Sequence, residues 1–117
     1  MIPSTYTLDN AIVIQLTDEL DADTLKTLRS DLTLFSELDN DLLLDMTDVT
    51  FIDSSGIGAI VYLYKRLSAS GHSLAIVNVS GQPERLFEML HLAKTIPCFA
   101  TLYDYMNWHK APQQKAG

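Results

Sequence analysis

Residues 42–67 read LLLDMTDVTFIDSSGIGAIVYLYKRL, and the hydrophobic period changes inside this stretch. The apolar run Leu42–Leu44 shows no polar/apolar alternation. It predicts a strand over about residues 41–45 that is buried on both faces, as in a parallel sheet covered by helices. We expect a polar turn over Met46–Val49 and a return to apolar surroundings at residues 51–52.

The segment Asp53-Ser54-Ser55-Gly56 ends the apolar run, and a helical pattern follows it. Apolar residues then recur at steps of three and four, which predicts a helix over about residues 55–69 that Gly71 terminates. A helix start carries partial positive charge and N–H groups without partners, so an anion is favoured there. A serine at this joint is therefore either a helix cap or a place for a phosphate. The apolar positions of the helix are Ile57, Ile60, Val61, Tyr64 and Leu67.

Two strands and a helix are predicted before this stretch. Tyr6–Leu8 and the β-branched run Ala11–Leu16 should pair as a hairpin, with the first strand at the edge of the sheet. A loop over Thr17–Asp21 leads into a helix over about residues 23–35. The apolar face of that helix consists of Leu25, Leu28, Leu32 and Phe35.

Strand and helix patterns continue to alternate after the central helix. We expect a buried strand over Leu74–Val79, a short helix over Glu84–Leu90, a strand near Phe99–Leu102 and a last helical turn or two over Tyr103–His109. The inward residues of the short helix should be Leu86, Phe87 and Leu90. This order predicts an α/β fold with a mixed, mainly parallel sheet of about five strands, an N-terminal hairpin and about four helices.

Length and composition limit the classes of protein to which the chain can belong. It has 117 residues, which suits one domain at residues 1–110 with a terminal segment, 111–117, that should fray. The net charge of −7 argues against a nucleic-acid partner; it either suits a basic protein partner or merely keeps the protein soluble. No apolar run reaches the ~20 residues of a membrane helix, and the N-terminus has no signal-peptide pattern. Cys98 is the only cysteine, which suits a reducing compartment. Together these features lead us to expect a cytoplasmic protein without membrane insertion.

Several residues around the joint have both a structural and a functional interpretation. Asp21 and Asp53 follow two strands and should lie at one edge of the sheet, where each carboxylate either caps a helix or binds a partner. Gly56 and Gly58 would each cost ~1 kcal/mol relative to alanine inside a helix. Either tight packing or the close approach of another backbone would explain them.

The motif Asp53-Ser54-Ser55-Gly56-Ile57-Gly58 resembles the D-S-[ST]-G-[apolar]-G motif of anti-sigma factor antagonists, the founding members of the STAS domain family. Glu19-Leu20-Asp21 resembles the E-L-D element of that family, and Asp18 stands where relatives commonly have glycine. The resemblance extends from about Tyr6 to Tyr103 and implies the α/β architecture already predicted from the sequence pattern.

The resemblance also implies which residues carry the function. Ser54 matches the serine that is phosphorylated in the family, and Ser55 would order the turn beside it. Asp21 matches an aspartate that takes part in partner recognition. We therefore expect a partner-binding edge that consists of Asp21, Asp53, Ser54, Ser55, Gly56, Ile57 and Gly58.

A binding module rather than an enzyme is what the resemblance implies. The unphosphorylated form would bind an anti-sigma factor that is also a serine kinase of the GHKL type, and so free the sigma factor. Phosphorylation of Ser54 would end the binding, and a PP2C-type phosphatase would reverse it. ATP and magnesium belong to the kinase, so this chain is expected to hold no cofactor and no metal.

Other functions stay open from the sequence alone. A STAS domain of this kind would also suit a switch in a non-sigma pathway or a subunit of a lipid or anion transport complex. A receiver domain phosphorylated on Asp53 fits the length, the acidity and the pair Asp18-Glu19. The opening hairpin and the lack of a lysine in Phe99–Leu102 oppose it. The standard motifs of nucleotide binding, zinc proteases and serine hydrolases are absent.

Overall fold

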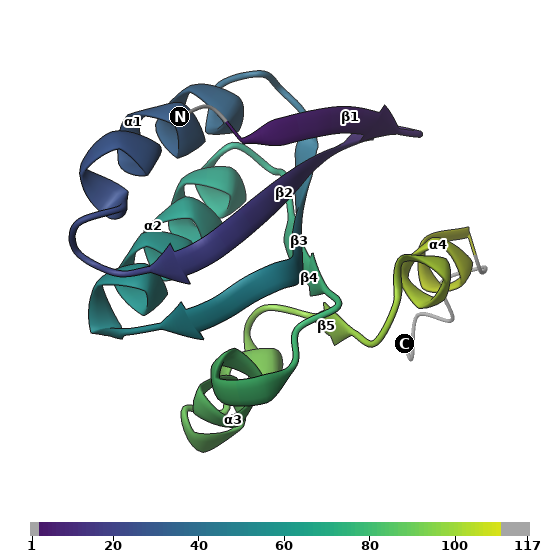
Figure 1. Cartoon of the computed structure of the whole chain (residues 1–117). Coiled ribbons are helices and arrows are strands. Elements are labelled where there is room, and N and C mark those ends of the chain that lie inside the picture. The colour runs from purple at the N-terminus through teal and green to yellow at the C-terminus, as the bar shows by residue number, and fades with distance from the viewer. Residues whose placement is uncertain (1–2, 111–117) are drawn as a thin grey trace.

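The computed structural model describes residues 3–110, which form a five-stranded sheet with helices on both faces (Figure 1). The strands lie in the order β1-β2-β3-β4-β5, with the first pair antiparallel and the other neighbours parallel. The predicted mixed, mainly parallel sheet with an N-terminal hairpin is therefore confirmed. The strands are β1 Ser4–Leu8, β2 Ala11–Leu20, β3 Asp41–Ile52, β4 Leu74–Val77 and β5 Cys98–Phe99.

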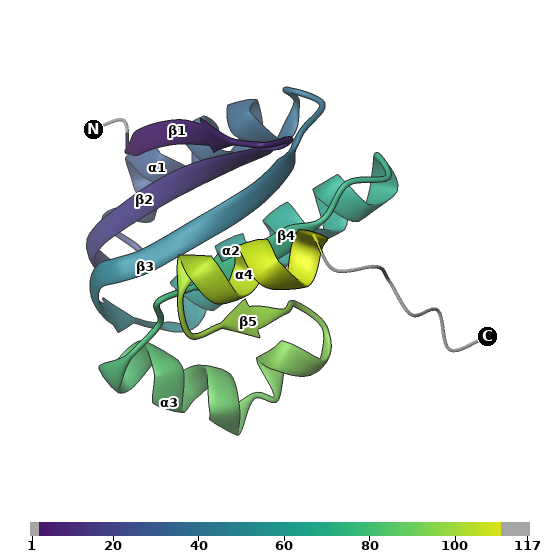
Figure 2. The ribbon, with the colours of Figure 1, turned by 90° about the vertical axis from the view of Figure 1, so that its right-hand side faces the viewer.

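Helices α1, α2 and α3 pack on one face of the sheet, and α4 packs on the other (Figure 2). None of the helices within residues 3–110 is long and apolar enough to cross a membrane. The helices are α1 Leu25–Ser36, α2 Ser54–Ala69, α3 Gly81–Met89, the short 3-10 helix η1 Leu92–Lys94, and α4 Leu102–Lys110.

The sheet separates two apolar cores, and β3 contributes to both. Leu42 and Leu44 belong to the larger core under α1, α2 and α3, whereas Leu43 belongs to the smaller core that Tyr105 of α4 covers. All three leucines are buried, so the prediction of a strand covered on both faces is confirmed.

The predicted apolar faces of the two long helices differ in how well they match the structure. On α1, Leu25, Leu28 and Leu32 are buried and Phe35 is partly buried against the core, as expected. The buried face of α2 is rotated slightly from the predicted one, and several of the predicted positions lie only partly buried beside it. The residues at its centre are Gly56, Ala59, Ile60, Leu63 and Leu67.

The two longest strands continue through segments for which the sequence predicted a loop and a turn, Thr17–Asp21 and Met46–Val49. Those predictions are wrong, because β2 runs to Leu20 and β3 runs to Ile52. Two register shifts keep the strands paired across this polar region. The apolar residues at both ends of the expected turn are buried in the core, while the polar residues between them are exposed.

Three expectations for the C-terminal third also need correction or stay untested. Leu90 lies outside the core, because α3 ends one residue before it. The strand expected near residues 99–102 is shorter and begins at Cys98, because α4 starts at its far end. There the Thr101 hydroxyl accepts a hydrogen bond of 3.0 Å from the Asp104 N–H. The terminal segment 111–117 lies outside the described residues.

His72 connects the end of α2 to the segment before β3. Its Nε2 lies 2.7 Å from Oδ1 of Asp39, and its Nδ1 lies 3.3 Å from Oδ1 of Asp41. The hydrogen bond with Asp39 raises the pKa of His72 above its ordinary value; burial opposes this rise, and Asp41 adds to it. Gly71 precedes the histidine at φ +80° and ends α2, as predicted.

We predict that this cluster makes stability depend on pH. A histidine whose pKa is raised by folding stabilises the protein fully below its unfolded pKa of ~6.5, and the effect is lost as the pH rises through the folded pKa. The unfolding free energy of the native chain, relative to His72→Gln, should therefore be largest between pH ~5 and ~6.5 and should fall above that range. Urea unfolding across this pH range tests it.

The control for this experiment is Asp39→Asn, which leaves the histidine in place and removes its closest carboxylate. The stability of this variant should depend less on pH than that of the native chain, because only Asp41 then remains beside His72. Parallel pH profiles for the native chain and His72→Gln would contradict the assignment.

Candidate functional site

Two paired strands end side by side at one edge of the sheet. Leu20 of β2 lies opposite Ile52 of β3, so Asp21 and Asp53 leave the sheet from neighbouring positions. The Asp53 N–H donates to the Leu20 carbonyl at 3.3 Å, which holds the two chain segments together. The predicted convergence of the two aspartates beside the start of α2 is present in the structure.

Asp53, and not a serine, caps helix α2. Its Oδ1 accepts hydrogen bonds from the N–H groups of Ser55 at 2.8 Å and Gly56 at 3.1 Å. The possibility that a serine hydroxyl acts as the cap is therefore wrong, because the carboxylate one residue earlier already satisfies these donors. Ser54, the first residue of the helix, is exposed, and its hydroxyl makes no hydrogen bond with any residue in the part of the chain that the structure describes.

The neighbouring serine lies in a different environment. Ser55 is half-buried and lines a hollow of about 250 Å³ between the start of α2 and helix α1. Two cations of α1, Lys26 and Arg29, line the same hollow. The two adjacent serines are thus distinct: Ser54 is exposed to solvent, and Ser55 is half-buried beside α1.

The two glycines of the motif lie in different surroundings. A Cβ atom on Gly56 would lie 2.5 Å from Cγ1 of Ile52 and 2.6 Å from the Leu20 carbonyl oxygen, so tight packing on a neighbouring backbone requires the glycine. Gly58 is exposed, and no atom lies within 4 Å of the position its Cβ would take. Packing within this chain therefore does not explain Gly58.

Asp21 forms a reciprocal pair of hydrogen bonds at the start of α1. Its Oδ1 accepts from the Thr24 N–H at 3.0 Å, and its own N–H donates to the Thr24 hydroxyl at 3.1 Å. The bond from the Thr24 N–H lowers the pKa of Asp21, although partial desolvation opposes the shift. The carboxylate is therefore ionised at neutral pH, and it helps begin the helix as well as contributing charge to the edge.

Gln82, which no sequence pattern marked, supports the same edge. Its Nε2 donates to the Ile52 carbonyl at 2.9 Å, and its Oε1 accepts from the Ile52 N–H at 2.9 Å. One side-chain amide thus binds both backbone groups of the residue that precedes Asp53. Helix α3 is fastened in this way to the end of β3.

Comparison of the sequence with known proteins identifies the family. The sequence matches the STAS domain family over residues 3–105. The chain belongs to the STAS domain family, among the anti-sigma factor antagonists. This STAS domain is 32% identical over 88 residues to the anti-sigma-B factor antagonist of Bacillus subtilis, a match that covers 75% of this chain and 81% of that protein.

Solved structures share the fold of this STAS domain at lower sequence identity. An anti-sigma factor antagonist from Mycobacterium paratuberculosis superposes with a TM-score of 0.83 at 21% identity, and 93% of each chain is covered. The Bacillus cell fate determinant SpoIIAA in its phosphorylated form superposes with a TM-score of 0.70 at 19% identity, covering 92% of this chain and 99% of that one. Family and topology together leave the receiver-domain alternative without support.

Asp18 in β2 has a backbone conformation that few residues other than glycine adopt. The sequence resemblance implies glycine at the position of Asp18, and the φ of Asp18 is +64°, in the left-handed region that glycine favours. Aspartate is among the few other residues that adopt this conformation at modest cost. The backbone of β2 therefore turns here as it would with glycine. Within residues 3–108, whose side chains the structure describes, no group of three or more His, Cys, Asp or Glu side chains could hold a metal ion.

We predict opposite effects on stability when each motif glycine is replaced by alanine. Gly56→Ala should lower the unfolding free energy by ~1–3 kcal/mol, because the new methyl group overlaps a fixed carbonyl. Gly58→Ala, the matched control, should raise it by up to ~1 kcal/mol through helix propensity. Urea unfolding of the two variants measures both; similar changes in the two would contradict the packing argument.

Proposed function

We propose that this STAS domain is a phosphorylation-controlled anti-sigma factor antagonist. In its unphosphorylated form it binds an anti-sigma factor that is also a GHKL-type serine kinase, and so releases the sigma factor. The kinase then phosphorylates Ser54 and the complex separates, and a PP2C-type phosphatase restores the binding form. The exchange takes place in the bacterial cytoplasm, where the single Cys98 stays reduced. The names of two curated relatives, antagonists of anti-sigma factors, support the general role.

One observation carries this proposal: the Ser54 hydroxyl is exposed and unbonded at the start of α2, because Asp53 already caps the helix. A kinase can reach such an oxygen without unfolding the helix. Its attack on the γ-phosphorus of ATP forms the Oγ–P bond, breaks the bond to the ADP oxygen and passes the hydroxyl proton to the kinase. Ser55 is the poorer acceptor, since it is half-buried against α1.

A phosphate on Ser54 is compatible with the folded chain. It adds a charge of about −1.5 to −2, which the start of α2 favours by ~0.3–1 kcal/mol at an exposed site. Lys26 and Arg29 lie in the adjacent hollow beside Ser55 and offer further positive charge. We therefore expect phosphorylation to leave the fold intact.

The same phosphate opposes binding of the partner. We define the docking edge as the surface formed by Asp21, Asp53, Ser54, Ser55, Ile57 and Gly58, with Gly56 buried beneath it. A partner surface that fits a neutral hydroxyl there would have to enclose a dianion next to two aspartates. Like-charge contacts and lost solvation at an interface cost several kcal/mol, and each ~1.4 kcal/mol lowers affinity about tenfold.

We predict that substitutions of the two serines will separate their roles. With the partner kinase captured by Ser54→Ala, calorimetry should show that this variant stays bound when ATP is added. The native chain should lose affinity by at least about tenfold. Ser54→Asp should lose part of its affinity. Ser55→Ala, the control, should still lose affinity when ATP is added, because its Ser54 hydroxyl is intact. A phosphopeptide map that places the phosphate on Ser55, or equal affinities of phosphorylated and unphosphorylated chains, would refute the proposal.

A second prediction concerns the charge of Asp21. Asp21→Asn keeps the oxygen that accepts from the Thr24 N–H and removes only the charge. We expect stability to change by no more than ~0.5 kcal/mol, while partner binding weakens by up to ~1 kcal/mol. Asp23→Asn, an exposed neighbour outside the docking edge, is the control for calorimetry and thermal unfolding. A loss of stability with unchanged binding would assign Asp21 a purely structural role.

A further inference from the structure

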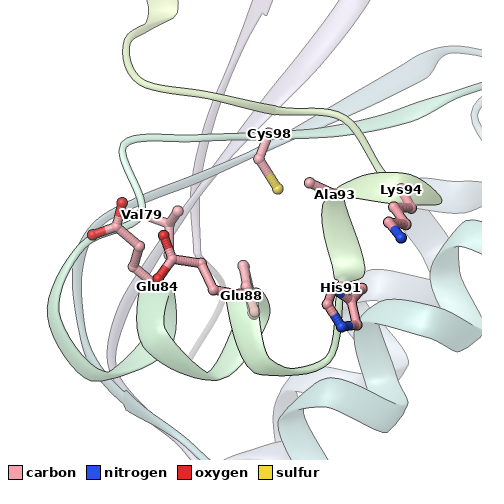
Figure 3. A pocket seen from close by; sticks show the side chains of 8 residues that line it. Val79, Glu84, Glu88, His91, Ala93, Lys94 and Cys98 are labelled. Carbon is pink, nitrogen blue, oxygen red and sulfur yellow. The ribbon is translucent and has the colours of Figure 1, made fainter.

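A hollow of about 380 Å³ lies between α3, η1 and β5 (Figure 3), and no residue of the docking edge lines it. Its volume falls within the ~300–1,000 Å³ range of small-molecule sites in proteins. Neither the glycines nor the serines of the STAS motif line it. The lining residues are Val79, Glu84, Phe87, Glu88, His91, Ala93, Lys94 and Cys98.

The interior of the hollow is apolar. Phe87 is buried, Val79 and Cys98 are half-buried, and the Cys98 sulfur and the Ala93 methyl point into the space (Figure 3). Burial raises the pKa of the Cys98 thiol, so that it stays neutral, and its sulfur lies 3.4 Å from the Ile96 carbonyl oxygen. The interior therefore suits a hydrocarbon group rather than a charged one.

The mouth of the hollow, by contrast, consists of exposed charged side chains: two carboxylates on α3, and Lys94 with His91 across from them. Glu84 and Glu88 stand one turn apart on α3 and lie at the same side of the hollow (Figure 3). Like charges at this spacing repel each other. Within residues 3–108, whose side chains the structure describes, no ion pair involves either glutamate, nor does one involve Lys94 or His91 at the opposite side.

We propose that this hollow binds a small organic amine whose apolar body fills the interior and whose ammonium group lies between Glu84 and Glu88. A single ammonium would donate to both carboxylates and remove their repulsion. An anionic ligand is less suited, since it could pair with Lys94 alone and would face two carboxylates in a chain of net charge −7. This site is independent of Ser54 and of the proposed exchange of partners.

Three probes share a cyclohexane ring and differ in the charge of the polar group, so they distinguish the contribution of charge to binding from that of the apolar ring. They are cyclohexylmethylamine, cyclohexylmethanol and cyclohexanecarboxylate. Each is titrated into the isotope-labelled full chain while backbone amide NMR signals are followed. The amine should give saturable shifts at the lining residues in the millimolar range. Its affinity should exceed that of the alcohol by about tenfold, equivalent to ~1.4 kcal/mol. The carboxylate should bind no better than the alcohol.

Two sets of variants assign the binding to the two parts of the site. Glu84→Gln with Glu88→Gln should reduce the amine to the affinity of the alcohol. The control, Asp23→Asn with Asp31→Asn, removes the same number of charges near α1 and should leave the preference for the amine intact. Ala93→Phe should fill the hollow and abolish binding of all three probes, and thermal unfolding verifies that each variant is folded.

Several results would overturn the proposal. They are the absence of saturable shifts with the amine, equal affinities for amine and alcohol, or tighter binding of the carboxylate. Shifts of the amine that map to the docking edge instead of the hollow would overturn it as well.

Discussion

The carbonyl group of Leu20 lies where the strands, the central helix and the candidate site meet. It accepts the N–H of Asp53, and its oxygen would lie 2.6 Å from any Cβ on residue 56. The end of β2 therefore sets both the direction in which the chain leaves β3 and the distance at which α2 can begin. Every residue of the proposed docking edge is placed by this contact, because each belongs to one of the segments that it joins.

Some residues of the motif are required by the fold, and others are exposed and available to a partner. Asp53 and Gly56 are needed by this chain, the first as the cap of α2 and the second for the close approach to β2. Ser54 and Gly58 are exposed and contribute no contact that the fold requires. A rigid helix start that presents an unbonded hydroxyl suits a switch, since the modification can change the surface without costing the fold much stability.

The sequence predicted the order of strands and helices because apolar periodicity is a local property that burial reinforces. It did not predict that β2 and β3 continue through Thr17–Leu20 and Met46–Ile52, because bulges and a left-handed Asp18 break the period there. Polar contacts between residues far apart in the sequence could not be predicted either. The amide of Gln82 reaches a residue 30 positions away, and His72 reaches back to Asp39 and Asp41, with no spacing rule that could reveal either.

The side chain of Gln82 also covers part of an unpaired strand edge. β4 pairs with β3 only from Leu42 to Asp45, so the remaining length of β3 has no strand beside it on that side among residues 3–110. An unpaired strand edge is a template on which a second chain can add, and this leads to aggregation or domain swapping. The Gln82 amide occupies the last rung of that edge with one donor and one acceptor, as another strand would. Glutamate, of nearly the same size, would lack the donor and leave the rung open.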